Sequence, residues 1–204
     1  ALPICTPELK FMTSILPYLS LTSLLAFFKK AECGPGIYRR KAGYYVCDNL
    51  SMFYYKYIFN RLSQLGIMDS EVFYDKYIDK DFEESFVPKQ FEEICKQYLI
   101  RQNLLGNIDP VLEKIGKYYY DDPKTRTNGE FDVVSIDEKG YVFYEVKFRK
   151  NKISDKIIEE EINQVKLTKL PCYKYVFFSR SGFDVKDAGE DVELIELGEM
   201  YSHK

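Results

Sequence analysis

The chain has 204 residues, of which 46% are hydrophobic and 30% charged, and its formal net charge at pH 7 is −3. This composition is typical of a globular protein with a sizeable core, and the acidic balance argues against a protein that coats nucleic acid indiscriminately. The five cysteines are widely spaced without a CxxC pair, and the single histidine is the penultimate residue. A disulfide framework, a zinc site and a histidine-based catalytic triad are therefore not expected, and a reducing cytoplasm is the expected compartment.

Residues 1–80 are predicted to form a winged-helix-like helical subdomain and a linker. Residues 8–32 have a helical pattern, and the apolar run within it contains a proline and five Ser or Thr residues, which favours two short packed helices over a membrane span. Two short β-like runs flank residues 39–43 and predict a hairpin, and helices followed by a basic hairpin are typical of a winged helix. Arg39 and Arg40 are therefore candidate nucleic-acid contacts, with a solvated hairpin tip as the alternative.

Residues 81–204 are predicted to form an α/β (α+β) domain with a central mixed sheet flanked by helices. Pro88 suits the first turn of a helix, because its missing N–H would have no helical partner there. The run CYKYVFFS is almost continuously apolar, as expected of a central strand covered on both faces. The expected elements are a bridging helix at 51–77, a helix from Pro88 to about Leu105, a strand near 117–120, a hairpin within 129–150, a helix at 154–169, a strand at Cys172–Ser179 and a short strand in VELIEL.

Charged residues lie among the hydrophobic residues of the hairpin. Placing Ile136 opposite Tyr141 across a loop of residues 137–140 puts Asp132 directly opposite Glu145. Period-two alternation then puts four charged side chains on one face: Glu130, Asp132, Glu145 and Lys147. Facing carboxylates repel one another, and the repulsion is relieved by a divalent cation, by a shared proton or by Lys147 alone.

Two carboxylates, a hard cation and a lysine suit the hydrolysis of a phosphodiester. The metal polarises the phosphate and lowers the pKa of bound water, and the ammonium steadies the attacking water or the developing charge. Asp132 and Glu145 are therefore predicted ligands of Mg²⁺ or Mn²⁺ and, with Lys147, the predicted catalytic residues. A salt bridge from Glu130 to Lys147 is the competing interpretation.

Basic residues follow this hairpin. Residues 147–156 contain five basic residues against one acid, so Arg149 and Lys150 are candidate phosphate contacts, with a solvated strand end as the alternative. The sequence has no GxxxxGK[ST] motif, so a P-loop ATPase site is absent from these 204 residues.

The hairpin pattern resembles that of the PD-(D/E)XK nuclease superfamily: EFDVV, then thirteen positions from Asp132 to Glu145 in EVK, then a helix and an apolar strand. More narrowly, FEEIC, EVKFR, FFSRSGF and YYVCDNLSMFYYKYIF resemble the nuclease-like C-terminal domain, with part of the winged-helix region, of archaeal and bacterial AAA-type ATPases. The resemblance implies a restriction-endonuclease-like core, with Asp132 and Glu145 as metal ligands and Lys147 as the catalytic lysine. It also implies that Glu92 joins the metal shell and that Gln164 contacts substrate.

The expected function is therefore that of a metal-dependent nuclease-like domain, the C-terminal part of an AAA-type ATPase. The alternative from another class is a non-catalytic DNA-binding, regulatory or dimerisation module of such an ATPase. Nucleic acid, chiefly DNA, is the expected partner, together with an ATPase domain of the longer protein. No membrane partner is expected, and a homodimer stays open.

Overall fold

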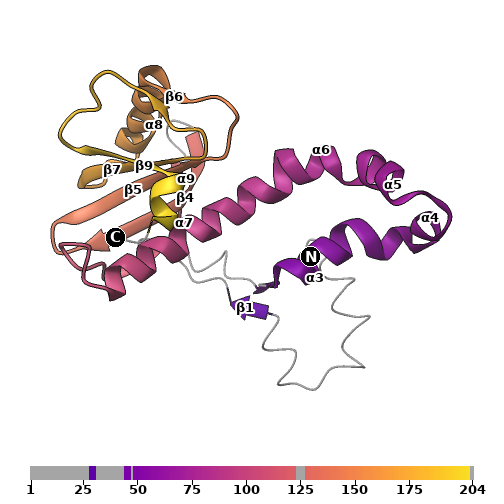
Figure 1. Cartoon of the computed structure of the whole chain (residues 1–204). Helices are drawn as coiled ribbons and strands as arrows, with labels where there is room; N and C mark the ends of the chain where they lie inside the picture. Colours follow the sequence, from indigo (N-terminus) through magenta and orange to yellow (C-terminus); the bar gives the residue numbers. More distant parts are fainter. Residues whose placement is uncertain (1–27, 31–43, 47, 123–126, 203–204) are drawn as a thin grey trace. The chain divides into compact units, whose positions relative to one another are not determined.

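The structure is a computed structural model that describes residues 28–30, 44–46, 48–122 and 127–202 (Figure 1). The described residues up to Phe82 form one compact unit, and those from Glu83 onward form a second. The helices and the hairpin tip of the predicted winged helix, with Arg39 and Arg40, lie outside the described residues. The winged-helix interpretation therefore stays a prediction.

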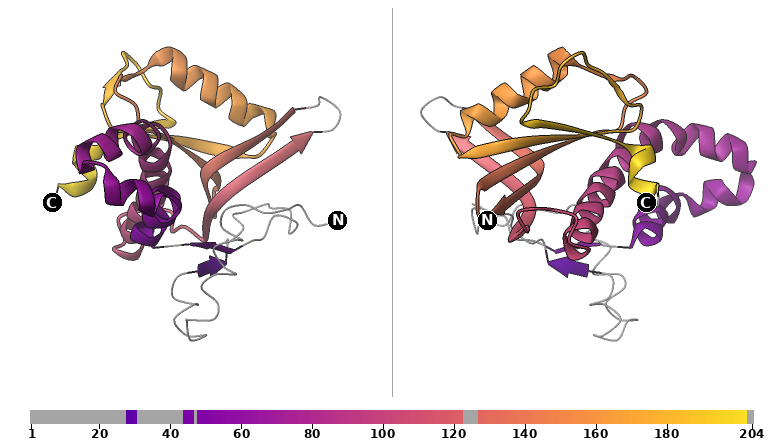
Figure 2. Two further views of the ribbon diagram at one scale, coloured as in Figure 1. Left: turned by 90° about the vertical axis from the view of Figure 1, so that its right-hand side faces the viewer. Right: turned by 60° about the vertical axis from the view of Figure 1, so that its left-hand side comes forward.

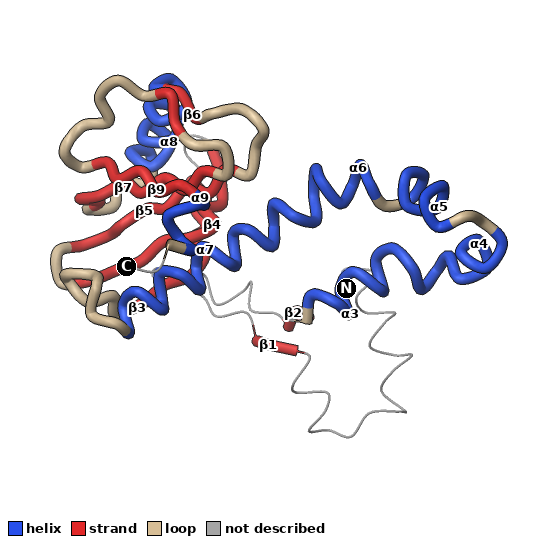
Figure 3. The backbone as a smooth tube through the Cα atoms, in the orientation of Figure 1, coloured by secondary structure: helices blue, strands red, loops and turns tan. Residues whose placement is uncertain are grey.

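The first unit combines a short strand pair with a series of helical segments (Figure 3). Strand β1 (Phe28–Lys30) pairs antiparallel with β2 (Tyr44–Val46), so the helix expected to reach residue 32 is wrong at residues 28–30. Backbone pairing of these three residues with β2 outweighs their local helical pattern. The helical segments are α3 (Asn49–Phe53), η2 (Tyr54–Ile58), η3 (Phe59–Arg61), α4 (Leu62–Ile67), α5 (Ser70–Tyr77) and α6 (Asp79–Asp81).

The second unit is a five-stranded mixed sheet flanked by helices, which confirms the expected α+β class (Figure 2). The strand order is β3-β4-β5-β7-β9, with β3, β4 and β5 antiparallel and with β7 and β9 parallel to β5. The five strands are β3 (Lys114–Asp122), β4 (Thr127–Asp137), β5 (Gly140–Lys147), β7 (Cys172–Ser179) and β9 (Val192–Glu196). The other elements are η4 (Phe82–Phe86), α7 (Val87–Leu104), β6 (Ile153–Ser154), α8 (Asp155–Leu167), β8 (Phe183–Asp184) and α9 (Leu197–Tyr201).

Each face of the sheet carries its own hydrophobic cluster. Helix α7 contributes buried residues at helical spacing to one cluster, whereas its Ile94 is 37% exposed. Helix α8 covers the other face together with β6. Buried members on the α7 side include Phe91, Cys95, Leu99, Val133, Val142, Tyr144 and Phe178, and those on the α8 side include Phe131, Val134, Phe143, Ile158, Val165 and Phe177. Within the described residues, no helix has both the length and the apolar character needed to cross a bilayer.

The turn between β4 and β5 sets the register of the whole hairpin. The buried Asp137 accepts hydrogen bonds on Oδ1 from the backbone N–H groups of Lys139 (2.8 Å) and Gly140 (3.2 Å), and its Oδ2 accepts one from the Tyr173 hydroxyl (2.5 Å). Gly140 has φ of 142°, and a Cβ there would lie 2.5 Å from the carbonyl oxygen of Pro171, so only glycine fits. The resulting pairs include Ile136 opposite Tyr141, which confirms the predicted register.

Substitution of Phe178 tests how much the buried side chains of strand β7 stabilise the second unit. The Phe178 side chain is 0% exposed on β7, so Phe178→Ala should lower the free energy of unfolding by about 3 to 5 kcal/mol in urea titrations. Leu104→Ala, at an 82% exposed position at the end of α7, is the control and should change it by less than about 0.5 kcal/mol. Equal effects of the two substitutions would contradict this placement of the core.

Candidate functional site

A β-bulge lies where the hairpin carries its charges. The register between β3 and β4 shifts so that two β4 residues, Asp132 and Val133, lie opposite the single β3 residue Lys117. A bulge of this kind breaks the alternation of side chains and redirects one of them. As a result the side chains of the consecutive residues Val133 and Asp132 lie on the same side of the sheet. Val133 packs in the hydrophobic cluster that contains the buried residues of α7, and Asp132 binds Lys117.

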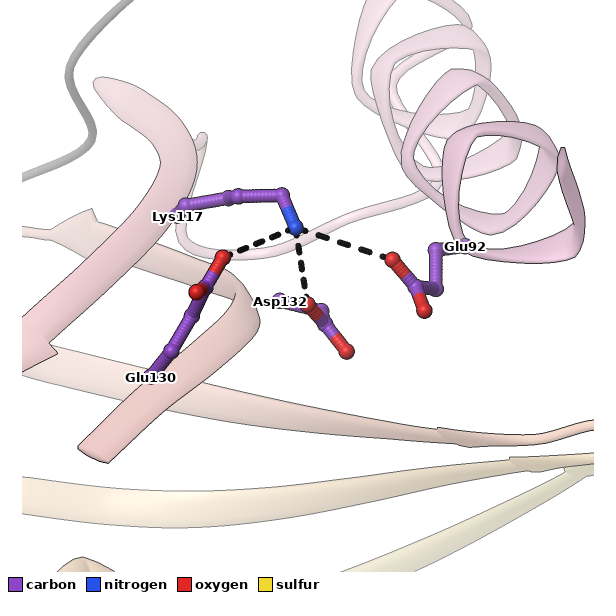
Figure 4. A network of polar contacts seen from close by, with 4 residues as sticks. All are labelled: Glu92, Lys117, Glu130 and Asp132. Carbon is purple, nitrogen blue, oxygen red and sulfur yellow. Dashed lines mark hydrogen bonds and ion pairs between the residues drawn. The ribbon is translucent and has the colours of Figure 1, made fainter. Parts of the chain in front are cut away.

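Lys117 is the centre of a network of three carboxylates (Figure 4). Its ammonium donates to Asp132 Oδ1 at 2.8 Å and to Glu130 Oε1 at 3.0 Å, and lies 3.6 Å from Glu92 Oε2 of α7. The Lys117 side chain remains 45% exposed, whereas that of Glu92 is 24% exposed. One ammonium therefore faces three carboxyl groups at a partly open surface.

The protonation of this network follows from burial and charge. Burial and the neighbouring Asp132 carboxylate raise the pKa of Glu92 to about 7, with Lys117 opposing the shift. Burial disfavours the ammonium of Lys117, but hydrogen bonds and charges from Asp132 and Glu130 outweigh it and raise the pKa of this lysine. Lys117 is therefore positively charged at neutral pH, while Glu92 changes its charge close to that pH.

A second, more buried cluster contains the other two predicted catalytic residues. The Lys147 ammonium lies 2.5 Å from Glu145 Oε1 and donates to Glu161 Oε1 of α8 at 2.7 Å. The three side chains are only 14%, 23% and 21% exposed for Lys147, Glu145 and Glu161. Burial disfavours the ammonium here as well, yet the two carboxylates raise the pKa of Lys147. Burial, with Glu161 and Asp132 adding to it, also raises the pKa of Glu145 against the effect of Lys147.

The expectation that all four hairpin charges share one face is wrong. Glu130 and Asp132 bind Lys117 beside α7, whereas Glu145 and Lys147 bind each other and Glu161 of α8. The bulge, which no alternation rule reveals, causes the difference. The competing salt bridge from Glu130 to Lys147 is wrong too, because Glu130 pairs with Lys117.

Asp132 and Glu145 nevertheless remain neighbours. The strands β4 and β5 pair from Asp137 and Gly140 to Val133 and Tyr144, so Asp132 and Glu145 are the next residues beyond the paired segment. The Asp132 charge contributes to the raised pKa of Glu145, which places the two carboxylates within electrostatic reach. The two clusters therefore adjoin at the point where β4 and β5 stop pairing.

The predicted phosphate contacts lie in the segment after β5, which is hydrogen-bonded to the segment after β7. Arg149 and Lys150 are exposed in the first segment. Three hydrogen bonds join the two segments: Arg180 N–H donates to Lys147 O (3.2 Å), Ser181 Oγ to Arg149 O (2.5 Å) and Ile153 N–H to Gly182 O (3.1 Å). The Arg180 guanidinium lies 4.6 Å from the centre of the Phe148 ring. Gln164 is partly buried on α8, the helix that carries Glu161.

Sequence reasoning missed two residues of these clusters. Lys117 gave no signal, because its meeting with Asp132 depends on the bulge. Glu161 did give a signal: it is three positions after Ile158 and four before Val165, so helical periodicity places it at the edge of the buried face of α8.

The donor set partly fits a hard divalent cation. Carboxylate oxygens are the ligands that Mg²⁺ prefers, and Glu92 lies near Asp132 as the family resemblance implies. As placed, however, the described residues contain no group of three or more His, Cys, Asp or Glu side chains that could bind one metal ion. The position at which Glu92, Glu130 and Asp132 converge is taken by the Lys117 ammonium.

Comparisons with known proteins concern proteins of unknown function. A family model, DUF234, described as "Archaea bacterial proteins of unknown function", matches residues 54–164, more than half of the chain. The "Uncharacterized protein MJECL04" of Methanocaldococcus jannaschii is 28% identical over 189 residues, which cover 87% of this chain and 40% of that protein. The chain thus spans well under half the length of this curated relative. A crystal structure of a "Protein of Unknown Function AF1548" matches 52% of this chain and 58% of its own, at 14% identity and a TM-score of 0.34.

The raised pKa of Glu92 makes stability depend on pH. The folded protein keeps the Glu92 proton up to about pH 7, whereas the unfolded chain releases it near the ordinary value of 4.5. The unfolded state binds fewer protons in between, so the free energy of unfolding should fall as pH rises from 5 to 8, by up to about 3 kcal/mol before solvent screening reduces it. Urea titrations across this range should show the slope in the wild type and a weaker one in Glu92→Gln.

Glu93→Gln is the matched control for that measurement. Glu93 lies on the same helix and accepts a hydrogen bond from Gln97 Nε2 at 3.3 Å, away from Lys117. This variant should keep the wild-type slope. A Glu92→Gln slope as steep as that of the wild type would show that another group causes the pH dependence.

Proposed function

We propose that this chain, which belongs to DUF234, a family of archaeal and bacterial proteins of unknown function, contains a nuclease-like domain of the PD-(D/E)XK type. It hydrolyses phosphodiester bonds of nucleic acid, chiefly DNA, in the cytoplasm, and it is the C-terminal part of a longer AAA-type ATPase. The greater length of the Methanocaldococcus relative is compatible with a further domain in the full protein.

The observation that supports this proposal is that Asp132 and Glu145 are the next residues of β4 and β5 beyond their paired segment, with Lys147 bound to Glu145. The hairpin register brings the two carboxylates to this point, and Asp132 influences the pKa of Glu145. Strand ends that gather acids and a lysine of this kind are suited to phosphate chemistry. Glu92 of α7 lies 3.6 Å from the Lys117 ammonium, and the family resemblance implies that a Glu on this helix can join the metal shell.

Lys147 acts as a fixed positive charge. Glu145 and Glu161 hold its ammonium from two sides, and its raised pKa keeps it protonated at neutral pH. A protonated lysine cannot accept a proton from water, so its role is to stabilise negative charge that develops on the phosphate. Glu161 is a positioning residue, because it acts on the reaction only through Lys147.

Asp132, Glu145 and Glu92 are the residues that would hold Mg²⁺ or Mn²⁺. When bound, such a cation would polarise the scissile phosphate and supply a more acidic water. Glu92 and Asp132 already share one cationic partner, and Glu145 would have to turn from Lys147 to join them.

Cleavage of plasmid and of single-stranded oligonucleotides with Mg²⁺ or Mn²⁺ tests the catalytic claim. Asp132→Asn and Lys147→Met should each lower the cleavage rate at least about a hundredfold, the loss typical of removing one group that stabilises transition-state charge. Lys166→Met, in the last turn of α8, is the charge-matched control and should retain the wild-type rate. Absence of cleavage by the wild-type chain, or wild-type rates in both variants, would contradict a nuclease.

A non-catalytic nucleic-acid-binding or regulatory module is the second candidate. It is favoured by the carboxylates, which are satisfied by lysines and are not placed as a metal-binding trio among the described residues. Such a module keeps its affinity for nucleic acid in Asp132→Asn and without metal. A homodimer of this module is a further form of the same candidate.

The exposed basic residues after β5 make binding testable without catalysis. Removing two phosphate contacts with Arg149→Ala plus Lys150→Ala should weaken binding of duplex DNA and reduce the slope of log Kobs against log salt by about 2. The measurement is fluorescence anisotropy of labelled duplex in EDTA at several salt concentrations. Lys96→Ala plus Arg101→Ala on α7 removes the same charge elsewhere in the unit and should change the slope little. Equal losses in the two double variants would indicate only a general charge effect.

A further inference from the structure

We infer that Arg180, on the turn that follows β7, is a phosphate-binding residue that holds the sugar-phosphate backbone of nucleic acid beside the carboxyl end of β5. This inference rests on the proposed nucleic-acid substrate and adds to it a binding residue outside the proposed catalytic set. The proposed reaction leaves the run FFSRSGF, which contains Arg180, without a role.

Arg180 lies next to the proposed catalytic lysine. Strands β5 and β7 are parallel and pair Lys147 with Ser179, so Arg180 is the first residue of its strand beyond that pair. The Arg180 backbone N–H donates to the carbonyl oxygen of Lys147 at 3.2 Å, which continues the pairing by one step. Ligands of open α/β sheets bind beyond the carboxyl ends of parallel strands, and Arg180 occupies such a position.

The turn that carries Arg180 is held in place from several sides. Ser179 is 1% exposed, and its Oγ donates to the carbonyl oxygen of Gly182 at 2.9 Å across the turn. The same carbonyl oxygen accepts a hydrogen bond from the N–H of Ile153 at 3.1 Å. Gly182 has φ of 80°, a left-handed conformation that glycine adopts without steric cost. The backbone that positions Arg180 is therefore fixed by its own hydrogen bonds.

The Phe148 ring supports the guanidinium of Arg180. The central carbon of the guanidinium lies over this ring at 4.6 Å from its centre, within the range of a cation–π contact. The ring centres of Phe148 and the buried Phe91 are 5.3 Å apart, so the support is itself packed against the core. A guanidinium that rests on a ring keeps N–H donors that match two oxygens of a phosphate. It also loses less conformational freedom on binding than an unsupported arginine does.

The charge of Arg180 is available to an anion. Arg180 is exposed, and it forms no ion pair with any Asp or Glu that the structure describes. Two lysines near the end of β5 differ in this respect, because Lys147 lies between two carboxylates and Lys150 lies 3.2 Å from Glu83 Oε2. A supported guanidinium without an acidic partner is suited to bind an anion from solution, and the phosphodiester backbone is the anion of the proposed substrate.

Binding of labelled DNA by the full chain in EDTA tests Arg180 without any cleavage. Arg180→Ala should raise the Kd for a duplex about tenfold at low salt, and should lower the slope of log Kobs against log salt by about 0.9, the value for one phosphate contact. Fluorescence anisotropy at several salt concentrations gives both quantities. Arg101→Ala removes another exposed arginine, in the last turn of α7, and should change the Kd by less than about twofold.

Two further variants separate the geometry of the guanidinium from its charge. Arg180→Lys keeps the charge without the planar fork, so it should keep the wild-type slope and bind about threefold more weakly. Phe148→Leu removes the ring face and should also keep the slope and weaken binding about threefold. Thermal unfolding checks that the variants fold, and both Arg180 variants should melt within about 4 °C of the wild type, because Arg180 is exposed.

The outcomes separate this inference from the proposed function. An unchanged affinity in Arg180→Ala, or an equal loss in Arg101→Ala, would overturn the inference and leave the nuclease standing. Wild-type affinity in both Arg180→Lys and Phe148→Leu would also overturn it, since the supported guanidinium would then be no better than any positive charge. If the wild type binds neither duplex nor single-stranded DNA in EDTA, the inference is wrong, while cleavage with Mg²⁺ still decides whether the chain is a nuclease.

Discussion

The β4–β5 turn is the constraint on which the site depends. Asp137 accepts two backbone hydrogen bonds and one from Tyr173, and Gly140 passes too close to Pro171 for any side chain. Because strand residues alternate between faces, a slip of one residue here would exchange the two faces of β5 relative to β4. It would also move Glu145 away from Asp132. The buried carboxylate of Asp137 at the turn thus determines which charged residues of β4 and β5 are neighbours at the other end of the hairpin.

The bulge beside Lys117 then divides those charges into two clusters with different properties. The α8-side cluster of Lys147, Glu145 and Glu161 is mostly buried, so its charges are weakly screened and its geometry is held from two sides. The α7-side cluster around Lys117 is more exposed, and water can replace its ion pairs at low cost. The same residue chemistry therefore provides one buried lysine held by two carboxylates and one lysine that is about half exposed.

The segments that follow β5 and β7 lie beside the buried cluster and carry exposed arginines. Backbone and hydroxyl hydrogen bonds join the segments after β5 and β7, so Arg149 and Arg180 are presented from an ordered frame that leads directly from Lys147. The Phe148 ring supports the Arg180 guanidinium and itself lies 5.3 Å from Phe91, the neighbour of Glu92 on α7. The hydrophobic core therefore contacts the charged residues directly in this region, and loss of either Phe would disturb both the core packing and the position of Arg180.

Within residues 81–204 the sequence by itself predicted the main helices and strands, the mixed sheet and the hairpin register, because these follow from local periodicity and from a short turn at residues 137–140. It also placed Asp132 and Glu145 opposite each other, but in the structure Asp132 binds Lys117 whereas Glu145 binds Lys147. Only the tertiary structure decided their partners. A bulge inserts one residue without a readable signal, and Lys117 and Glu161 reach the site from elements 15 and 14 positions away in the chain from Asp132 and Lys147. Long-range pairing of this kind depends on how strands and helices pack, which local patterns do not encode.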